Sequence, residues 1–299
     1  MLNIVGHKKI YFAVSGVLIL ASILAMVIFR FHQGIDFRGG TLWQFGIKEG
    51  TPSMGELNGV FQSELSVSDA RINYDEVNGI FFVRLGEVSE EKHQIFLGEL
   101  KGKYPSLGEL SFQSIGPSVG IKLRNNALMA MGLVLLGISF YIAFVFRKAS
   151  RPVSSWKYGW VTLMTLFHDV AIPAGLLAVL GRYRGVEIDT NFLVALLVVM
   201  GFSVHDTIVV FDRIRENLIT GKGREKFETV VNSSVNQTLG RSINTSFTLI
   251  LVLLALYFSG PVNLHYFILT LLVGVTTGIY SSIFIASPTL LLLVGKKDA

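Results

Sequence analysis

The sequence lacks cysteine altogether and is poor in charged side chains. It has 0 Cys in 299 residues, and Asp, Glu, Lys and Arg make up only 16% of the chain, against roughly a quarter in soluble domains. The absence of cysteine excludes disulfides and thiolate metal sites. With 51% hydrophobic residues, the shortage of charge argues against a soluble globular protein and indicates a membrane protein.

The hydrophobic residues are concentrated in six long blocks. A helix needs roughly 20 apolar residues to cross about 30 Å of hydrocarbon, and each block reaches or approaches that length. The first block is longer than the apolar region of a signal peptide and lacks a convincing A-x-A cleavage site, so we interpret it as a retained anchor. The predicted transmembrane helices are Ile10–Phe29, Ala127–Phe146, Tyr158–Leu180, Thr190–Phe211, Ser242–Phe258 and His265–Val294.

The net charge of +5 comes from lysine and arginine placed in alternate loops. They occur at Lys8 and Lys9, in 147–157, in 213–241 and at the C-terminus, whereas the loops between the other spans are poorer in them. Short loops rich in Lys and Arg stay in the cytoplasm. We therefore predict that both termini are cytoplasmic, and we interpret the basic excess as a topology signal that implies no nucleic-acid partner.

A hydrophilic insert at 30–124 separates the first block from the other five, and the predicted topology places it outside. Its pattern alternates between strand and helix periods, with Asn78-Gly79 as a strong hairpin turn. The order βαββαβ predicts a small ferredoxin-like α+β domain. It contains no catalytic triad, phosphate loop or cluster of His and Asp, which indicates a binding or structural role. The expected elements are strands at Thr41–Ile47, Arg71–Asp75, Ile80–Leu85 and Glu109–Ile115, and helices at Ser53–Leu65 and Ser89–Tyr104.

The fold class is therefore an α-helical membrane protein with an exported α+β domain. Residues 1–29 form the cytoplasmic N-terminus and first helix, 30–124 the exported domain, and 125–299 the remaining five helices. Within the last part, 211–241 is predicted to be cytoplasmic. Its apolar residues at helical spacing predict an amphipathic helix on the inner membrane surface; they are Phe227, Val230, Val231 and Val235.

The sixth block carries a stripe of small residues. Gly274, Gly278, Ser282 and Ala286 recur every four positions, so they share one helix face. Small residues at this spacing let two helix backbones approach closely in lipid. Because five other spans are available as neighbours, we expect an internal helix contact here.

Two aspartates lie inside apolar runs, Asp206 in the fourth block and Asp169 in the third, the latter beside His168. A charged side chain at the bilayer centre costs about 2.5–3.5 kcal/mol on insertion scales, so such residues usually serve a function. Asp169 is nearer the middle of its span. Asp206 lies about 9 Å from the inner end of its span at 1.5 Å per residue. From the residues alone, Asp206 is either a proton carrier or an interfacial residue that reaches towards water.

Polar neighbours accompany each of these sites. Thr162, Thr165 and Asp169 share one helix face, and Pro173 cannot donate to the carbonyl of residue 169, so this stripe is a candidate site for water or a cation. His205 points about 100° away from Asp206 on a helix, so the two cannot face one partner squarely.

Arg241 begins the fifth block and is followed by Asn244, Thr245 and Thr248 on one polar face. An arginine at a helix end can also reach the interface by snorkelling without any further role. The functional and the anchoring interpretation of Arg241 therefore both stand.

Several of these segments resemble the signature motifs of SecF, a branch of the SecD/SecF family of protein-export membrane proteins. They are Gly34-Ile-Asp-Phe-Arg-Gly-Gly-Thr41, Asp206-Thr-Ile-Val-Val-Phe-Asp-Arg-Ile-Arg-Glu-Asn217, Arg241-Ser-Ile-Asn-Thr-Ser246 and His168-Asp169. The resemblance covers the whole chain, with one span, an exported domain and five further spans. One departure is His205, which stands where the family usually has Asn.

The resemblance implies a fold related to RND exporters, in which SecD and SecF each supply six spans in the bacterial inner membrane. It implies a partner of SecD beside the SecYEG translocon that assists the translocating preprotein. The energy source would be the proton motive force and not ATP, with no enzyme activity and no cofactor; the coupling ion is H⁺ or Na⁺. In the family, the residues matching Asp206 and Arg241 are linked to proton passage. We add Asp169, His168, His205 and Thr245 as candidate relay residues.

Two other functions compete with this one. An RND-type exporter of small molecules or lipids, of which this chain would be a half-size form, would want large exported domains and a complete twelve-span chain, and this sequence has neither. A purely structural membrane subunit would leave the intramembrane acids unexplained.

Overall fold

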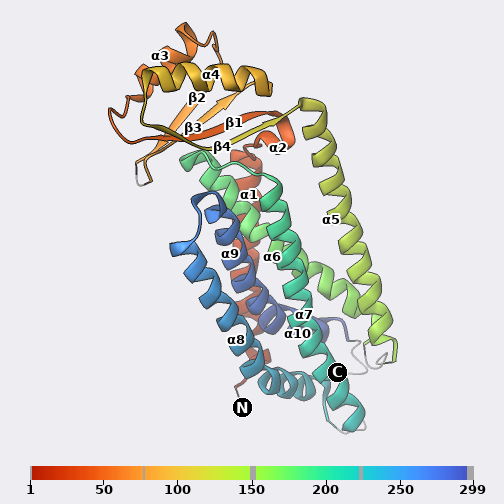
Figure 1. Ribbon diagram of the computed structural model, residues 1–299. Coiled ribbons are helices and arrows are strands. Elements are labelled where there is room, and N and C mark those ends of the chain that lie inside the picture. Colours follow the sequence, from red (N-terminus) through yellow and green to blue (C-terminus); the bar gives the residue numbers. More distant parts are fainter. Residues whose placement is uncertain (1, 77, 149–152, 222–224, 295–299) are drawn as a thin grey trace. The chain divides into compact units, whose positions relative to one another are not determined.

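The computed structural model describes residues 2–76, 78–148, 153–221 and 225–294. It divides into two units, one made of Met1–His32 with Met129–Ala299 and the other of Gln33–Leu128. Figure 1 shows their helices and strands. The basic residues at 149–152 and 295–299, which the charge argument uses, lie outside the described residues.

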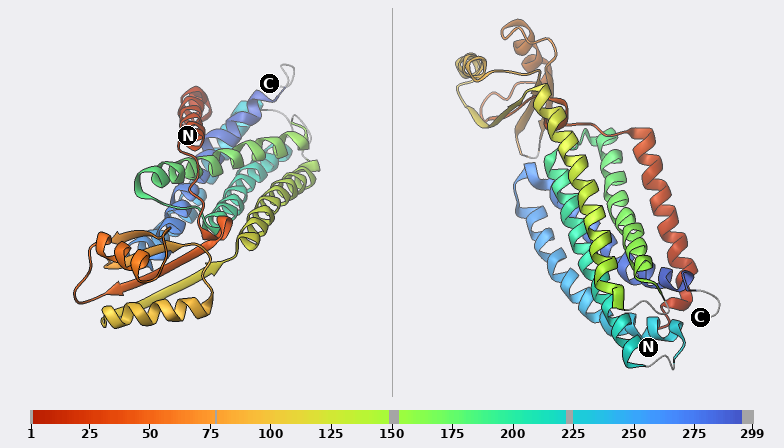
Figure 2. Two further views of the ribbon diagram at one scale, coloured as in Figure 1. Left: turned by 90° about the horizontal axis from the view of Figure 1, so that it is seen from above. Right: turned by 90° about the vertical axis from the view of Figure 1, so that its right-hand side faces the viewer.

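Six helices of the described chain are long and apolar enough to cross a membrane, which confirms the predicted count. They are Val5–Phe29, Pro117–Val145, Ser155–Arg184, Thr190–Thr220, Phe227–Ser259 and Val262–Leu292. The corresponding elements are α1 (Lys8–Phe29), α5 (Pro117–Val145), α6 (Ser155–Arg184), α7 (Thr190–Thr220), α8 (Phe227–Ser259) and α9 (His265–Ser281) with its continuation. In the helical unit α9 packs against α6, α7 and α8, and α1 packs against α6 (Figure 2).

The sixth span is not one regular helix. After α9 the chain forms a π-helical turn, Ser282–Ala286, and then α10, Ser287–Leu292. Pro288 lies near the start of α10. Proline lacks an N–H and clashes with the carbonyl four residues earlier, so the wider turn before it accommodates a position that a regular helix would not. The prediction of a continuous helix at His265–Val294 missed this turn.

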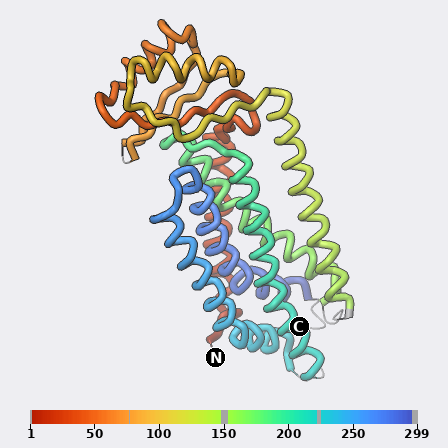
Figure 3. Tube along the Cα trace, in the orientation of Figure 1, coloured from red at the N-terminus to blue at the C-terminus, as the bar shows by residue number. Residues whose placement is uncertain are grey.

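The fifth span differs more. It was predicted to be the shortest, yet α8 is a single helix of 33 residues that includes the amphipathic segment. No proline interrupts 227–259, so the helix can continue through the predicted boundary at Ser242. Its first turns nevertheless point in another direction than the rest of the helix (Figures 1 and 3). The apolar face that was expected to lie on the membrane is instead buried in the protein, with Phe227, Val231 and Val235 in its core.

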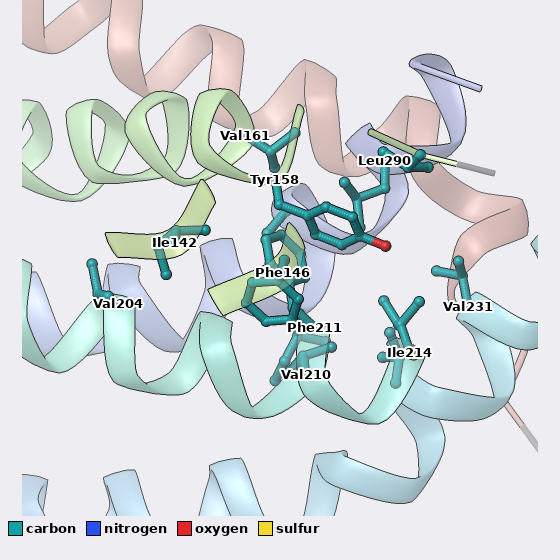
Figure 4. Packing of buried hydrophobic residues seen from close by; sticks show 14 of the residues in the cluster. Ile142, Phe146, Tyr158, Val161, Val204, Val210, Phe211, Ile214, Val231 and Leu290 are labelled. Atoms are coloured by element: carbon teal, nitrogen blue, oxygen red, sulfur yellow. The ribbon is translucent and has the colours of Figure 1, made fainter. Parts of the chain in front are cut away.

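This core joins the helices of the membrane unit at one end. Phe146 stacks on Tyr158, with ring centroids 5.0 Å apart, and Phe211 meets Tyr158 edge-on at 5.1 Å. Figure 4 shows Val231 of α8 in the same cluster. The start of α8 also binds the N-terminal segment, because the Asn232 side chain accepts hydrogen bonds from the backbone N–H groups of residues 4 and 5. The apolar face of this helix segment is therefore covered by protein.

The α+β unit has the predicted order and the ferredoxin-like sheet. Its four strands run β2-β3-β1-β4, all pairs being antiparallel, and α3 and α4 cover one face (Figure 1). The Ser53 side chain and Glu56 form a capping box at α3, and Ser89 caps α4. The elements are α2 (Ile35–Arg38), β1 (Gly40–Ile47), α3 (Met54–Ser63), β2 (Arg71–Asp75), β3 (Ile80–Leu85), α4 (Glu90–Lys103) and β4 (Leu107–Ile115).

The core of this unit is aromatic. Trp43, Phe45, Phe61 and Phe81 are completely buried between the sheet and its helices. The Trp43 indole donates to the Glu109 carboxylate at 2.9 Å, which satisfies its polar N–H. The alternating pattern of β1 therefore places its large residues inward, as the sequence predicts.

Candidate functional site

Asp206 lies on α7 and is buried, with 5% of its surface exposed. Its two carboxylate oxygens accept hydrogen bonds from serines on two other elements. The Ser242 hydroxyl of α8 donates to Oδ1 at 2.6 Å, and the Ser282 hydroxyl at the π-helical turn donates to Oδ2. The carboxylate is therefore held at the junction of three elements.

Asp169 lies on α6 and is completely buried. The Ser281 hydroxyl of α9 donates to its Oδ2 at 2.7 Å, and the Ser203 hydroxyl of α7 donates to the same oxygen. The His168 Nδ1 lies 2.8 Å from Oδ1. Three hydrogen-bonding groups from three helices thus surround this carboxylate.

Helix geometry explains how a few residues serve two sites. Ser203 and Asp206 are three positions apart on α7 and therefore share a face. Ser281 and Ser282 are adjacent, and adjacent residues point about 100° apart. Ser281 reaches Asp169 on α6, while Ser282 reaches Asp206 on α7. The last residue of α9 and the first residue of the π-helical turn thereby connect both carboxylates.

Close packing brings α9 to these partners. A Cβ added at Gly274 would lie 2.2 Å from Val199 Cγ2, and one at Gly278 would lie 3.3 Å from Ser203 Cβ. The small-residue stripe is therefore an internal helix contact, as expected. Without it, α9 could not bring Ser281 against Asp169.

The other predicted relay residues lie outside this arrangement. Arg241, Thr245 and His205 are exposed in the described chain. Arg241 directly precedes Ser242, but it is the Ser242 hydroxyl that contacts Asp206. His205 and Asp206 face different surroundings, as their spacing predicts.

The two threonines of the polar stripe on α6 bind their own helix, and the site for water or a cation beside Asp169 stays a prediction. The Thr162 hydroxyl donates to the Tyr158 carbonyl at 2.9 Å, and the Thr165 hydroxyl donates to the Thr162 carbonyl at 2.9 Å. Both threonines are buried, but their hydroxyls satisfy their own helix backbone. Asp169 takes its serine partners from α7 and α9.

The sequence interpretation missed the serines as ligands of the carboxylates. Ser203 lies on the same helix as Asp206 but binds Asp169, and Ser282 was assigned only a packing role. Ser242 and Ser281 were not singled out. A usable signal exists, since Ser281-Ser282 lies in the middle of an apolar span, where hydroxyls need a partner.

Three of the buried polar atoms that have no hydrogen-bond partner among the described residues belong to residues close in sequence to the site residues. They are the hydroxyls of Thr207 and Ser246 and the Nε2 of His168. Thr207 follows Asp206, and Ser246 is one helical turn after Ser242. Buried polar groups normally have partners, and exceptions often accompany a functional role or bound water. The surroundings of both carboxylates therefore have spare hydrogen-bonding capacity.

Comparisons with known proteins agree on one family. The family model "Protein export membrane protein SecD/SecF, C-terminal" matches residues 97–296. The protein translocase subunit SecF of Thermobaculum terrenum is 41% identical, with 100% of this chain and 95% of that protein covered. The protein translocase subunit SecDF of Brucella abortus is 31% identical over 96% of this chain and 37% of that protein.

A solved structure shows the same fold. The crystal structure of SecDF, a translocon-associated membrane protein from Thermus thermophilus, matches with a TM-score of 0.78 and 33% identity. The match covers 97% of this chain and 38% of the SecDF chain, so this chain corresponds to part of that longer protein.

Proposed function

This chain belongs to the SecD/SecF family of protein-export membrane proteins and matches its SecF subunits along its whole length, and we propose that it assists preprotein translocation by using the proton motive force. In this proposal it acts with SecD beside the SecYEG channel in the bacterial inner membrane. The exported domain is the part that responds to ion movement through the helical unit. The matched chains that combine SecD and SecF in one name support the partnership with SecD.

The observation that carries the proposal is the buried carboxylate of Asp206. A carboxylate in a low-dielectric region is costly, and its two serine partners can act as donors or as acceptors. Asp206 can therefore be held in both the charged and the protonated form. Moving one charge through 100 mV supplies about 2.3 kcal/mol, which is enough to shift a two-state helix arrangement more than tenfold.

Asp169, with His168 beside it, is the second candidate carrier in this proposal. Arg241 and Thr245 are assigned to the exposed face of α8, where the guanidinium would meet a partner helix or headgroup. His205 is assigned a modifying role, because a second titrating group next to Asp206 can alter the pH response. The coupling ion is H⁺ in this proposal, and no cofactor takes part.

The test is Asp206→Asn in the full chain with its SecD partner. Asn keeps the size and a hydrogen-bonding edge but cannot carry a proton. We expect stimulation of preprotein export by a proton gradient to be abolished while membrane insertion and folding are unchanged. The matched control is Asp212→Asn on the same helix, since Asp212 is half-exposed and pairs with Arg215 at 2.6 Å.

The control should export normally. Normal export by Asp206→Asn under a proton gradient would refute the proton-carrier role. Repeating the assay on the unsubstituted protein with a sodium gradient in place of the proton gradient distinguishes the ions. Export stimulated by Na⁺ alone would overturn the assignment of H⁺.

A further inference from the structure

The hydroxyls of Ser281 and Ser282 each have two acceptors. Ser281 Oγ lies 2.7 Å from Asp169 Oδ2 and 3.2 Å from the Gly278 carbonyl oxygen. Ser282 Oγ contacts Asp206 Oδ2 and lies 3.0 Å from the carbonyl oxygen of residue 279. Because a hydroxyl has a single proton, each serine donates mainly to one acceptor at a time. That acceptor is either a carboxylate on another helix or a carbonyl of the serine's own helix.

The backbone connects these two choices. The N–H of Ser282 donates to both carbonyls, those of Gly278 and Ile279, at the point where α9 changes to the π-helical turn. The Ile279 carbonyl is thus shared by the N–H and the hydroxyl of Ser282. The Gly278 carbonyl is shared by that same N–H and the hydroxyl of Ser281. π-Helical turns occur frequently at functional sites.

We propose that Ser281, Ser282 and the peptide N–H between their side chains are a positioning device that couples the two buried carboxyl groups. The contacts form an unbroken series between the two carboxyl groups. From Asp206 Oδ2 it passes through the Ser282 hydroxyl, the Ile279 carbonyl, the Ser282 N–H, the Gly278 carbonyl and the Ser281 hydroxyl to Asp169 Oδ2. Each step in it is a hydrogen bond, and neighbouring hydrogen bonds influence one another cooperatively. The inference deepens the proposed function, since it names what connects two carriers that lie on different helices.

The coupling follows from one protonation step. When Asp206 takes up a proton, an O–H group forms at Oδ2. This group donates a hydrogen bond to Ser282 Oγ. The Ser282 hydroxyl keeps its own proton and turns it to the Ile279 carbonyl. That carbonyl then accepts less from the Ser282 N–H, which moves towards the Gly278 carbonyl. The Ser281 hydroxyl then has to share the Gly278 carbonyl with a closer N–H, so the hydrogen bond that it already donates to Asp169 Oδ2 strengthens.

The test is infrared spectroscopy on the purified full chain, which reads the hydrogen bonding of each carboxyl group. The bands of Asp169 and Asp206, in whichever protonation state, are assigned by their loss in Asp169→Asn and Asp206→Asn. The amide introduced by Asp206→Asn also stands in for the neutral acid, so this protein should show a displaced Asp169 band. No displacement of that band would overturn the proposal before any serine is changed.

The serines are then tested in the same way. Ser282→Ala and Ser281→Ala each interrupt the series, so Asp206→Asn should no longer displace the Asp169 band in either background. Ser282→Thr keeps the hydroxyl and should retain the displacement. The matched control is Ser287→Ala, because Ser287 is equally buried but its hydroxyl donates to the Ser282 carbonyl at 3.2 Å and to neither carboxylate.

The displacement should survive in Ser287→Ala. A displacement that also survives in both Ser281→Ala and Ser282→Ala would show that the carboxyl groups communicate by another route. If one alanine variant does not fold, the other still interrupts the series at its opposite end. The spectra require no transport, so an Asp206→Asn protein that exports normally would refute the proposed function and leave the coupling standing.

Discussion

At the scale of single residues, serine hydroxyls bind both buried carboxylates. Among the described residues, Asp206 is bound by Ser242 and Ser282, and Asp169 by Ser203, Ser281 and the His168 ring. A hydrogen bond to a charged group contributes about 1.5–3 kcal/mol. A buried cation beside a carboxylate would favour only its charged form. Hydroxyl partners serve both forms of the acid, which suits a group that must gain and lose a proton.

Arg241 provides the first residue-scale prediction. Its place at the start of the fifth span predicts that it pairs with Asp206 in at least one state of the transport cycle, although in this structure it is exposed and the Ser242 hydroxyl binds Asp206. We expect Arg241→Met to lower proton-driven export about as far as Asp206→Asn does. The double variant should be little worse than either single one, since residues that act as a unit are non-additive. Export by the three variants measures this.

The competing role for Arg241 is an anchor at the lipid headgroups. In that case Arg241→Lys would export normally, since lysine snorkels equally well. Additive losses in the double variant would also contradict the pairing with Asp206. The lysine variant and the double variant therefore separate the two roles.

Another residue-scale prediction concerns Glu90 in the α+β unit. A hydrogen bond from Gln94, and a weaker one from His93, hold the pKa of the exposed Glu90 carboxyl below its ordinary value of 4.5. A lowered pKa in the folded state means that the carboxylate stabilises the fold above the ordinary glutamate range. This contribution is lost as the pH falls through the lowered pKa.

We expect the amide protection of α4 against hydrogen exchange to fall across that acidic window. Gln94→Ala removes the main cause of the lowered pKa of Glu90. The protection of α4 should then depend less on pH in this window. Gln62→Ala, at an exposed position of α3, is the control and should leave the profile unchanged. An unaltered profile in Gln94→Ala would contradict the assignment.

At the scale of elements, the close approach of α7 and α9 determines where the serines lie. Gly274 faces Val199, and a Cβ there would overlap the valine methyl at 2.2 Å. Overpacking of this kind costs about 1–3 kcal/mol. We expect Gly274→Ala to lower the thermal unfolding midpoint of the purified protein and to reduce export.

Gly201→Ala is the matched control for that variant, because nothing lies within 4 Å of a Cβ built on Gly201 of α7. It should leave the midpoint unchanged or raise it, since alanine is the better helix former by about 1 kcal/mol. Adding Val199→Ala to Gly274→Ala should recover part of the loss. A Gly274→Ala protein as stable as the control would show that the helices do not need this contact.

At the scale of the whole molecule, the charge pattern predicts a topology that can be labelled directly. The chain has 0 Cys, so a single introduced cysteine reports its own side of the membrane. Ile95 on α4 and Ile219 on α7 are 59% and 64% exposed. An impermeant thiol reagent should label Ile95→Cys in intact cells and should label Ile219→Cys only after permeabilisation. Labelling of Ile219→Cys in intact cells would contradict the predicted orientation.

The sequence by itself determined the periodic parts of this protein. The six apolar blocks, the order of the α+β domain and the bounds of Arg71–Asp75 and Ile80–Leu85 follow from local patterns and turn residues, and each is confirmed. Burial of Asp169 also follows from its apolar neighbours, whereas the sequence left open whether Asp206 is buried or reaches towards water. These features depend on residues that are close together in the chain, so one local window contains the information.

Only the tertiary structure decided which residues meet the carboxylates. Ser242 and Ser282 lie 36 and 76 positions from Asp206, and no local pattern links residues so far apart. The turn at Ser282–Ala286 arises from Pro288 and from packing against α7 together. The buried face of α8 looks the same in sequence whether it lies on lipid or on protein, because both are apolar. Its place in the core depends on the helices that surround it.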